Sequence, residues 1–104
     1  MLVDNPSKDD MSRTQAEFRS ERCAGYLSTM ARHFSQKIEV TQVDDAVHLH
    51  FICGLAVLSL NDDALHIRII SPSAPQMQQT CEVVESHLLR FAFREEFENM
   101  PWES

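Results

Sequence analysis

IEVTQVDDAVHLHFICGLAVLSLNDDALHIRII, residues 38–70, is the stretch that decides the fold. Apolar and polar side chains alternate through most of it, which is typical of β-strands with one buried face. The alternation restarts after Val43-Asp44-Asp45, around Gly54 and after Asn61-Asp62-Asp63, where Asx and Gly residues favour turns. Because such short turns join neighbouring antiparallel strands, the stretch predicts a four-stranded meander.

Two helical patterns and one further strand flank this meander. Residues 12–18 alternate weakly and predict a strand, and Ser20 is then placed to cap a helix from about 21 to 35. After the meander, Ser73 and Gln76 have the spacing of a capping box. The helix behind them should bury one stripe of side chains: Met77, Cys81, Val84, Leu88 and Phe91.

The element order predicts an α+β fold, a two-layer sandwich in the order β-α-β-β-β-β-α. A sheet with one apolar face needs a cover, and two amphipathic helices supply it on that face. Residues 1–11 are polar and are expected to form a disordered tail, so one α+β domain should span residues 12–104. The closing segment FENMPWES has no clean period and contains Pro101, which limits it to an edge strand or a packed tail.

Composition excludes several classes of function. The 104-residue chain has a net charge of −7, which disfavours binding to nucleic acid or to an anionic membrane surface. Proteins, cationic partners and small ligands remain open, and no residue pattern implies a cofactor. Neither a basic, apolar leader nor a membrane-length apolar run is present. The three cysteines have no motif spacing and are expected to be reduced thiols of a cytoplasmic protein: Cys23, Cys53 and Cys81.

Histidines gather on the predicted uncovered face of the sheet. His48 and His50 are two residues apart on one strand, so their side chains share a face, and such a pair can chelate zinc, nickel or copper. His66 lies one strand further away, at about 9–10 Å, which is long for a third ligand. This face, which also carries Arg68, could bind a ligand or a second copy of the chain, or it could simply face water.

Catalytic signatures are missing from the sequence. It contains no GxSxG, no HExxH and no Cys–His motif, and two glycines are too few to form a phosphate-binding loop. The chain is therefore expected not to be an enzyme, and a small enzyme with an unrecognised site is the alternative.

HLLRFAFREE, residues 87–96, crowds arginines and aromatics at the predicted end of the second helix. Arg90 and Arg94 are four residues apart and complement the negative end of the helix dipole, while Phe91 completes the buried stripe. The stretch is thus either a helix terminus with aromatic anchors or a partner-binding patch formed by Arg90, Phe93 and Arg94.

Three segments together resemble a bacterial family known as domain of unknown function 2218. They are AGYLSTMARHFSQKIEV (24–40), the strand turn with Phe51, Gly54 and Ala56, and HLLRFAFREE, which is the most specific of them. The chain departs from the family pattern at Gly25, where an arginine is typical, and at Ile52-Cys53, where a proline precedes the glycine.

The resemblance implies an element order like that of TATA-binding-protein-type domains. It also implies an accessory or binding role in siderophore-iron utilisation, because such domains are attached to or encoded near flavin-dependent siderophore-interacting proteins. One of those proteins or a small ligand is then the expected partner, and the anionic charge of many ferric siderophores suits the exposed arginines.

Overall fold

The computed structural model describes residues 11–92 and 100–103 of the chain, and the predicted element order is confirmed. The elements are β1 (Ser12–Arg19), α1 (Cys23–Ser35), β2 (Glu39–Val43), β3 (Ala46–Phe51), β4 (Gly54–Asn61), β5 (Ala64–Ser71) and α2 (Ala74–Phe91). The tail expected at residues 1–11 lies outside the described residues except for Met11.

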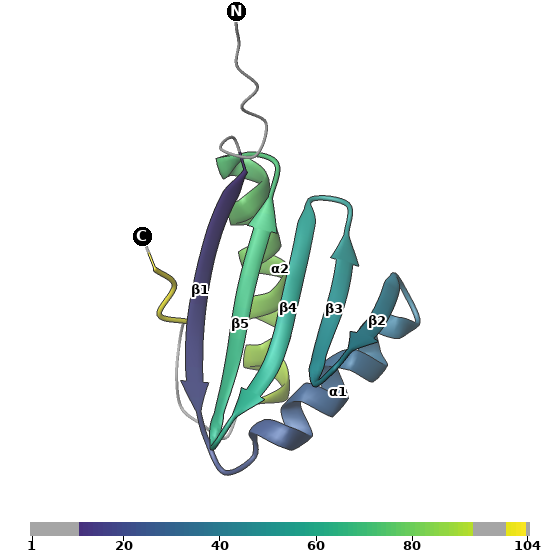
Figure 1. Cartoon of the computed structure of the whole chain (residues 1–104), viewed down its shortest axis with the longest axis vertical. Helices are drawn as coiled ribbons and strands as arrows, with labels where there is room; N and C mark the ends of the chain where they lie inside the picture. Colours follow the sequence, from purple (N-terminus) through teal and green to yellow (C-terminus); the bar gives the residue numbers. More distant parts are fainter. Residues whose placement is uncertain (1–10, 93–99, 104) are drawn as a thin grey trace, which may run out of the picture.

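The strands form one antiparallel sheet in the order β1-β5-β4-β3-β2, which Figure 1 shows. The meander from β2 to β5 is as the alternation predicts, and β1 completes the sheet by pairing with β5. The turns after β2 and β4 each contain one aspartate in the left-handed region, Asp44 with φ of 55° and Asp62 with φ of 58°. Asp tolerates that conformation better than most residues, which explains the DD pairs.

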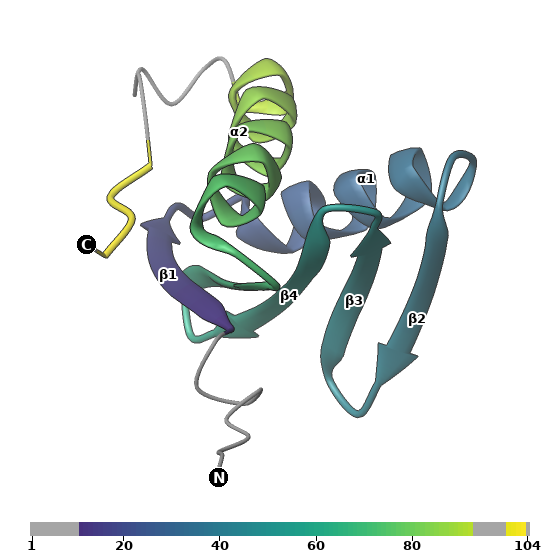
Figure 2. The same cartoon turned by 90° about the horizontal axis from the view of Figure 1, so that it is seen from above.

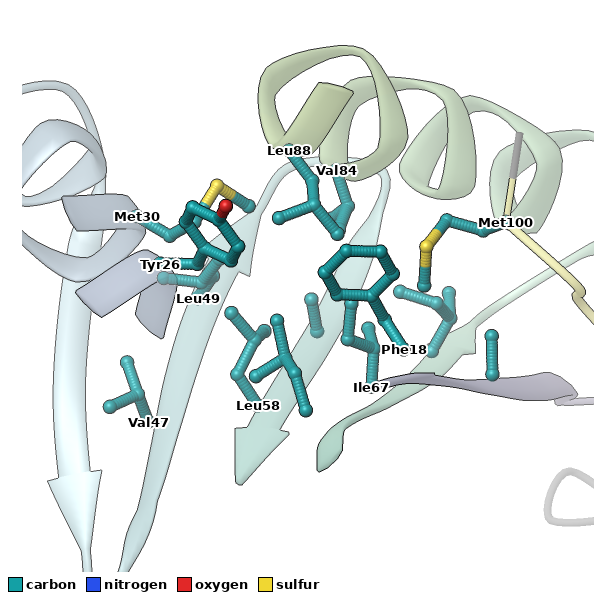
Figure 3. Packing of buried hydrophobic residues seen from close by; sticks show 14 of the residues in the cluster. Phe18, Tyr26, Met30, Val47, Leu49, Leu58, Ile67, Val84, Leu88 and Met100 are labelled. Carbon is teal, nitrogen blue, oxygen red and sulfur yellow. The ribbon is translucent and has the colours of Figure 1, made fainter. Parts of the chain in front are cut away.

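Both helices pack on the same face of the sheet, as Figure 2 shows. Alternate side chains of the strands point towards them, and Figure 3 shows Leu49, Leu58 and Ile67 meeting side chains of the helices. From the helices, Met30, Val84 and Leu88 are completely buried in this core. The layers therefore have the predicted arrangement: both helices cover one face, and no described helix or strand covers the other.

The two helices begin differently. Ser73 caps α2 as predicted, and its Oγ accepts a hydrogen bond from the Gln76 backbone N–H at 3.3 Å. The prediction that Ser20 caps α1 is wrong, because Arg22 is the N-cap residue and its side chain makes no capping bond. Ser20 Oγ instead accepts from the Arg22 backbone N–H at 3.0 Å, which closes a tight turn before the helix.

Residues 100–103 form a packed tail along β1. Met100 is buried, and Trp102 Nε1 donates to Glu85 Oε1 at 2.8 Å. The Glu103 backbone N–H donates to Gln15 O at 3.0 Å, and Thr14 Oγ1 donates to Glu103 O at 2.7 Å. These bonds close the outer edge of β1, so the sheet has one protected edge.

Candidate functional site

The uncovered face of the sheet, called the open face below, carries the residues that the alternation placed there. Pairing between the strands arranges them in rows across the sheet. One row is Thr41, His48, Val57, Arg68 and Gln15. The next row is Glu39, His50, Leu55, Ile70 and Arg13. His66 lies beyond the first row, between Ser59 and Glu17.

The centre of the open face is apolar, which the sequence-based interpretation did not emphasise. Leu55 and Ile70 are half-buried there, and Val57 is only 3 % exposed although it lies outside the core under the helices. Its neighbours in the row, His48 and Arg68, flank it on the adjacent strands. The continuous apolar run LAVL in β4 is typical of a strand covered on both faces, and it was the available signal.

His48 and His50 lie side by side on β3, as predicted for an HxH pair. Their ring centroids are 6.3 Å apart and the rings are tilted by 33°. His50 Nε2 is 3.0 Å from Thr41 Oγ1, so one ring nitrogen already has a hydrogen-bond partner. Across residues 11–92 and 100–103, no three His, Cys, Asp or Glu side chains are grouped closely enough to hold an ion. Metal binding by this pair would need ligands from water or from another molecule.

His66 takes part in a hydrogen-bonded chain with the carboxy-terminal tail. Its Nε2 is 2.9 Å from Gln15 Oε1, and Gln15 Nε2 donates to Glu103 Oε2 at 3.0 Å. Because the Gln15 oxygen can only accept, His66 carries a proton on Nε2 in this arrangement. These hydrogen bonds orient the Gln15 side chain between His66 and Glu103 and link β5, β1 and the tail.

Two guanidinium groups flank a hollow at the β1 end of the open face. It has a volume of about 240 Å³. It is lined by Arg13, Thr14, Gln15, Arg68, Ile69, Ile70 and Glu103. Arg68 pairs directly with Gln15, and Arg13 is its diagonal neighbour, a relation that puts Cβ atoms about 7–8 Å apart. Both arginines are exposed, and among the described residues neither makes an ion pair.

The arginine patch predicted in HLLRFAFREE does not join the open face. Arg90 is exposed in the last turn of α2, on the helical side of the sheet, whereas Arg68 and His66 lie on the opposite side. Phe93 and Arg94 lie outside the described residues. Phe91, predicted to be buried, is half-buried, because it lies at the end of the helix beside His33, with ring centroids 5.5 Å apart.

A histidine pair between the helices was missed by the sequence reading. His33 and His87 have ring centroids 5.0 Å apart, and His87 Nδ1 lies 2.7 Å from Val83 O, to which it donates. Burial lowers the pKa of His33, and the positive charges near it, on His87 first and then on Lys37 and Arg90, lower it further. Its Nε2 is buried without a partner among the described groups. Spacing within one helix gives no signal for such a contact between helices.

A larger hollow lies on the helical side. It has a volume of about 700 Å³ between α2 and the β3–β4 turn. Its lining is Ile38, Phe51, Ile52, Cys53, Gln79, Glu82, Val83 and Ser86. It is wide and mostly apolar, with one carboxylate, and it lacks convergent polar groups of the kind that orient a small ligand. The open face has those groups, so it is the better candidate site despite its smaller hollow.

None of the three cysteines lies on a strand of the open face. All three thiols are free, and Cys23 and Cys81 are buried. Burial, reinforced by Glu85 and Glu82, raises the pKa of Cys81 to about 11, which keeps this thiol protonated and unreactive. Cys53 is half-buried and accepts a hydrogen bond from Thr80 Oγ1 at 3.1 Å.

Comparisons with known proteins support the family resemblance. The family model described as "Uncharacterized protein conserved in bacteria (DUF2218)" matches residues 15–103. The NMR structure of PA4090 from Pseudomonas aeruginosa is similar over 88 % of this chain and 92 % of that one, with a TM-score of 0.68 and 23 % identity. At this identity the likeness shows the fold alone. No curated protein matches the sequence. None of the described helices has the length and apolar character that crossing a membrane requires.

Proposed function

Because the chain belongs to the bacterial family of uncharacterised DUF2218 proteins, matched over residues 15–103, we propose that it is a non-catalytic binding domain whose open face holds an anionic partner. The observation that supports this most is the pair of exposed guanidinium groups of Arg13 and Arg68 beside an apolar centre. Aromatic or aliphatic contact area next to a few oriented polar groups is the usual composition of a binding site.

Local charge, and not the net charge, supports an anionic partner. The whole chain carries −7, which opposes long-range attraction of an anion, so binding depends on the contacts made by Arg13 and Arg68. Two carboxylates lie close to the arginines, and both have other partners. Glu17 is paired with Arg19 at 3.3 Å, and Glu103, which lines the hollow, accepts a hydrogen bond from Gln15 Nε2 at 3.0 Å. Among the described residues neither is ion-paired with Arg13 or Arg68. Guanidinium groups bind carboxylates in a two-pronged geometry, and the Gln15 side chain between them adds a polar contact.

Citrate is a suitable first probe, because it presents several carboxylates at once. Titrating it into the isotope-labelled 12.0-kDa chain should shift backbone amide resonances of β1 and β5 and leave those of α1 and α2 in place. Arg68→Gln should weaken binding about tenfold or more, because a hydrogen bond to a charged group contributes about 1.5–3 kcal/mol. Arg32→Gln, on the exposed side of α1, is the matched control.

Three outcomes would contradict the proposal that the open face binds an anion. Shifts centred on the helices, or equal affinities of the wild type and Arg68→Gln, would place the anion elsewhere. No shift at millimolar citrate, well above the concentration expected for a paired-arginine site, would remove anion recognition from the open face.

The position of His48 and His50 on one face of β3 favours a second candidate function, metal binding. Their rings share one face and lie 6.3 Å apart, which a rotation of the side chains can convert into a chelating pair. The partner suggested by the family resemblance, a flavin-dependent siderophore-interacting protein, and the cytoplasmic location suggested by the free thiols both stay predictions.

A further inference from the structure

The two edges of the sheet differ. The tail at residues 100–103 hydrogen-bonds along β1, whereas β2 ends the sheet on the other side, as Figure 1 shows. Within the described residues, no other segment makes backbone hydrogen bonds to β2 from its outer side. Exposed edges are usually blunted by proline, charged side chains or a bulge. The strand β2 is EVTQV, whose only charged residue is Glu39 at its first position, and it contains neither proline nor lysine.

Strand register shows which backbone groups of β2 face outwards. Val43 pairs with Ala46 across a two-residue turn, and the residues that flank such a turn form a hydrogen-bonded pair. Bonding alternates along an antiparallel ladder, so Thr41 also directs its backbone towards β3. Val40 and Gln42 therefore direct their N–H and C=O groups away from the sheet.

We propose that the outer edge of β2 pairs antiparallel with β2 of a second copy of this chain, about a two-fold axis at Thr41. In this register Val40 lies opposite Gln42 of the second copy, so the outward donors and acceptors of both strands meet. Thr41 lies opposite Thr41, and neither pair brings like charges together. Val43, which is 49 % exposed in the single chain, gains a neighbour across the axis.

Charges beyond the ends of β2 favour an antiparallel partner. Lys37 precedes the strand, in the turn that follows α1, and Asp45 follows the strand, in the turn before β3. Antiparallel pairing about Thr41 brings the turn that contains Lys37 of one copy towards the turn that contains Asp45 of the other, twice by symmetry. Both side chains are exposed, and within the strand Glu39 lies opposite the uncharged Val43.

The neighbouring registers that keep the backbone groups matched pair less of the strand. With the axis at Thr41, the middle residue, all five residues of β2 lie opposite β2 of the second copy. Moving the axis one residue in either direction leaves only three of the five opposite β2 and sets the other two opposite residues outside the strand. A dimer about Thr41 would extend the sheet from five strands to a continuous ten and join the two open faces edge to edge.

Sedimentation equilibrium on the full chain, from micromolar to millimolar concentration, tests the proposal. The wild type should form dimers. Gln42→Pro removes an outward N–H that the intramolecular ladder does not use, so it should abolish the dimer while circular dichroism and Tm stay near the wild type. Gln42→Thr keeps that N–H and should stay dimeric.

Charge exchange tests the antiparallel pairing without a proline. Lys37→Asp and Asp45→Lys should each weaken association, because each brings like charges together where the turn after α1 of one copy meets the β2–β3 turn of the other. The double variant, with both changes, should restore the dimer. A monomeric wild type at every concentration, a dimeric Gln42→Pro chain, or a double variant that stays monomeric would each overturn the proposal. The citrate titration detects binding through the amide resonances of β1 and β5, whereas sedimentation detects association through β2. Failure of the anion proposal can therefore be distinguished from failure of the dimer proposal.

Discussion

Replacing Gly54 by alanine should destabilise the protein through crowding. A Cβ built there would collide with Ser71 Oγ and lie 2.7 Å from Thr80 Oγ1 and 2.9 Å from Ile70 O. Ser71 and Thr80 are completely buried and their hydroxyls are 3.2 Å apart, so neither can swing into solvent. Gly54 has no positive φ, which means that the cost arises from space and not from backbone conformation.

The magnitude follows from these contacts. Overpacking of a filled core costs about 1–3 kcal/mol. Disturbing the Ser71–Thr80 hydrogen bond adds about 1 kcal/mol, so we expect Gly54→Ala to lower the free energy of unfolding by about 2–4 kcal/mol in total. For a domain of this size the Tm should fall by roughly 10–25 °C. Urea denaturation followed by circular dichroism measures the difference.

Gly25→Ala is the matched control. No atom lies within 4 Å of a Cβ at Gly25, which is exposed in α1, so alanine there should stabilise the chain by about 0.5–1 kcal/mol. Adding Ser71→Ala to Gly54→Ala should recover part of the loss, because it removes the closest obstacle. If Gly54→Ala unfolds within about 0.5 kcal/mol of the wild type, the packing of the β3–β4 turn against β5 and α2 is not as described.

Other predictions follow from the core and from the histidines. Leu88→Ala should lower the free energy of unfolding by about 2–5 kcal/mol in urea denaturation, because Leu88 of α2 is completely buried in the core. A loss below about 1 kcal/mol would contradict the packing of α2 on the sheet. The pKa of His33 is lowered in the folded chain, so the unfolded chain binds more protons; stability should be constant above about pH 6.5 and fall as the pH drops through the folded-state value. His33→Gln should flatten that slope in denaturation curves, and an unchanged slope would assign it to other groups. Zn²⁺ should raise the Tm of the wild type but not of His50→Gln if the His48–His50 pair binds metal, and equal shifts in both proteins would exclude the pair.

Element order was predictable because most elements have a strong local pattern, β1 with its weak alternation being the exception. The period of two in residues 38–70 and the stripe of α2 specify which face is buried. The structure follows both, except that Met77 and Phe91 at the two ends of the stripe are half-buried. Helix capping was less predictable. Ser20 has the right residue type, but the chain turns once more before α1 begins, so the hydroxyl bonds to the turn instead of to the helix.

Contacts between distant segments were not predictable from spacing. The pairing of His33 with His87 depends on how α1 crosses α2, and the bond from Trp102 to Glu85 depends on where the tail lies. Neither relation leaves a periodic trace in the sequence. The apolar centre at Val57 is visible in the sequence as the run LAVL of β4. That run does not identify an open face, because it is equally typical of a central strand in a sheet that is covered on both faces.

The division between a covered and an open face is most directly tested by relaxation of methyl protons with a soluble gadolinium chelate in dilute solution. Two pairs of side chains on the same strands give the comparison: Leu55 with Leu58 on β4, and Ile70 with Ile67 on β5. Leu58 and Ile67 are completely buried, whereas Leu55 and Ile70 are half-buried on the open face. The account predicts that the methyl groups of Leu55 and Ile70 relax markedly faster and become protected when citrate is added. Equal relaxation within both pairs, or faster relaxation of Leu58 and Ile67, would contradict it.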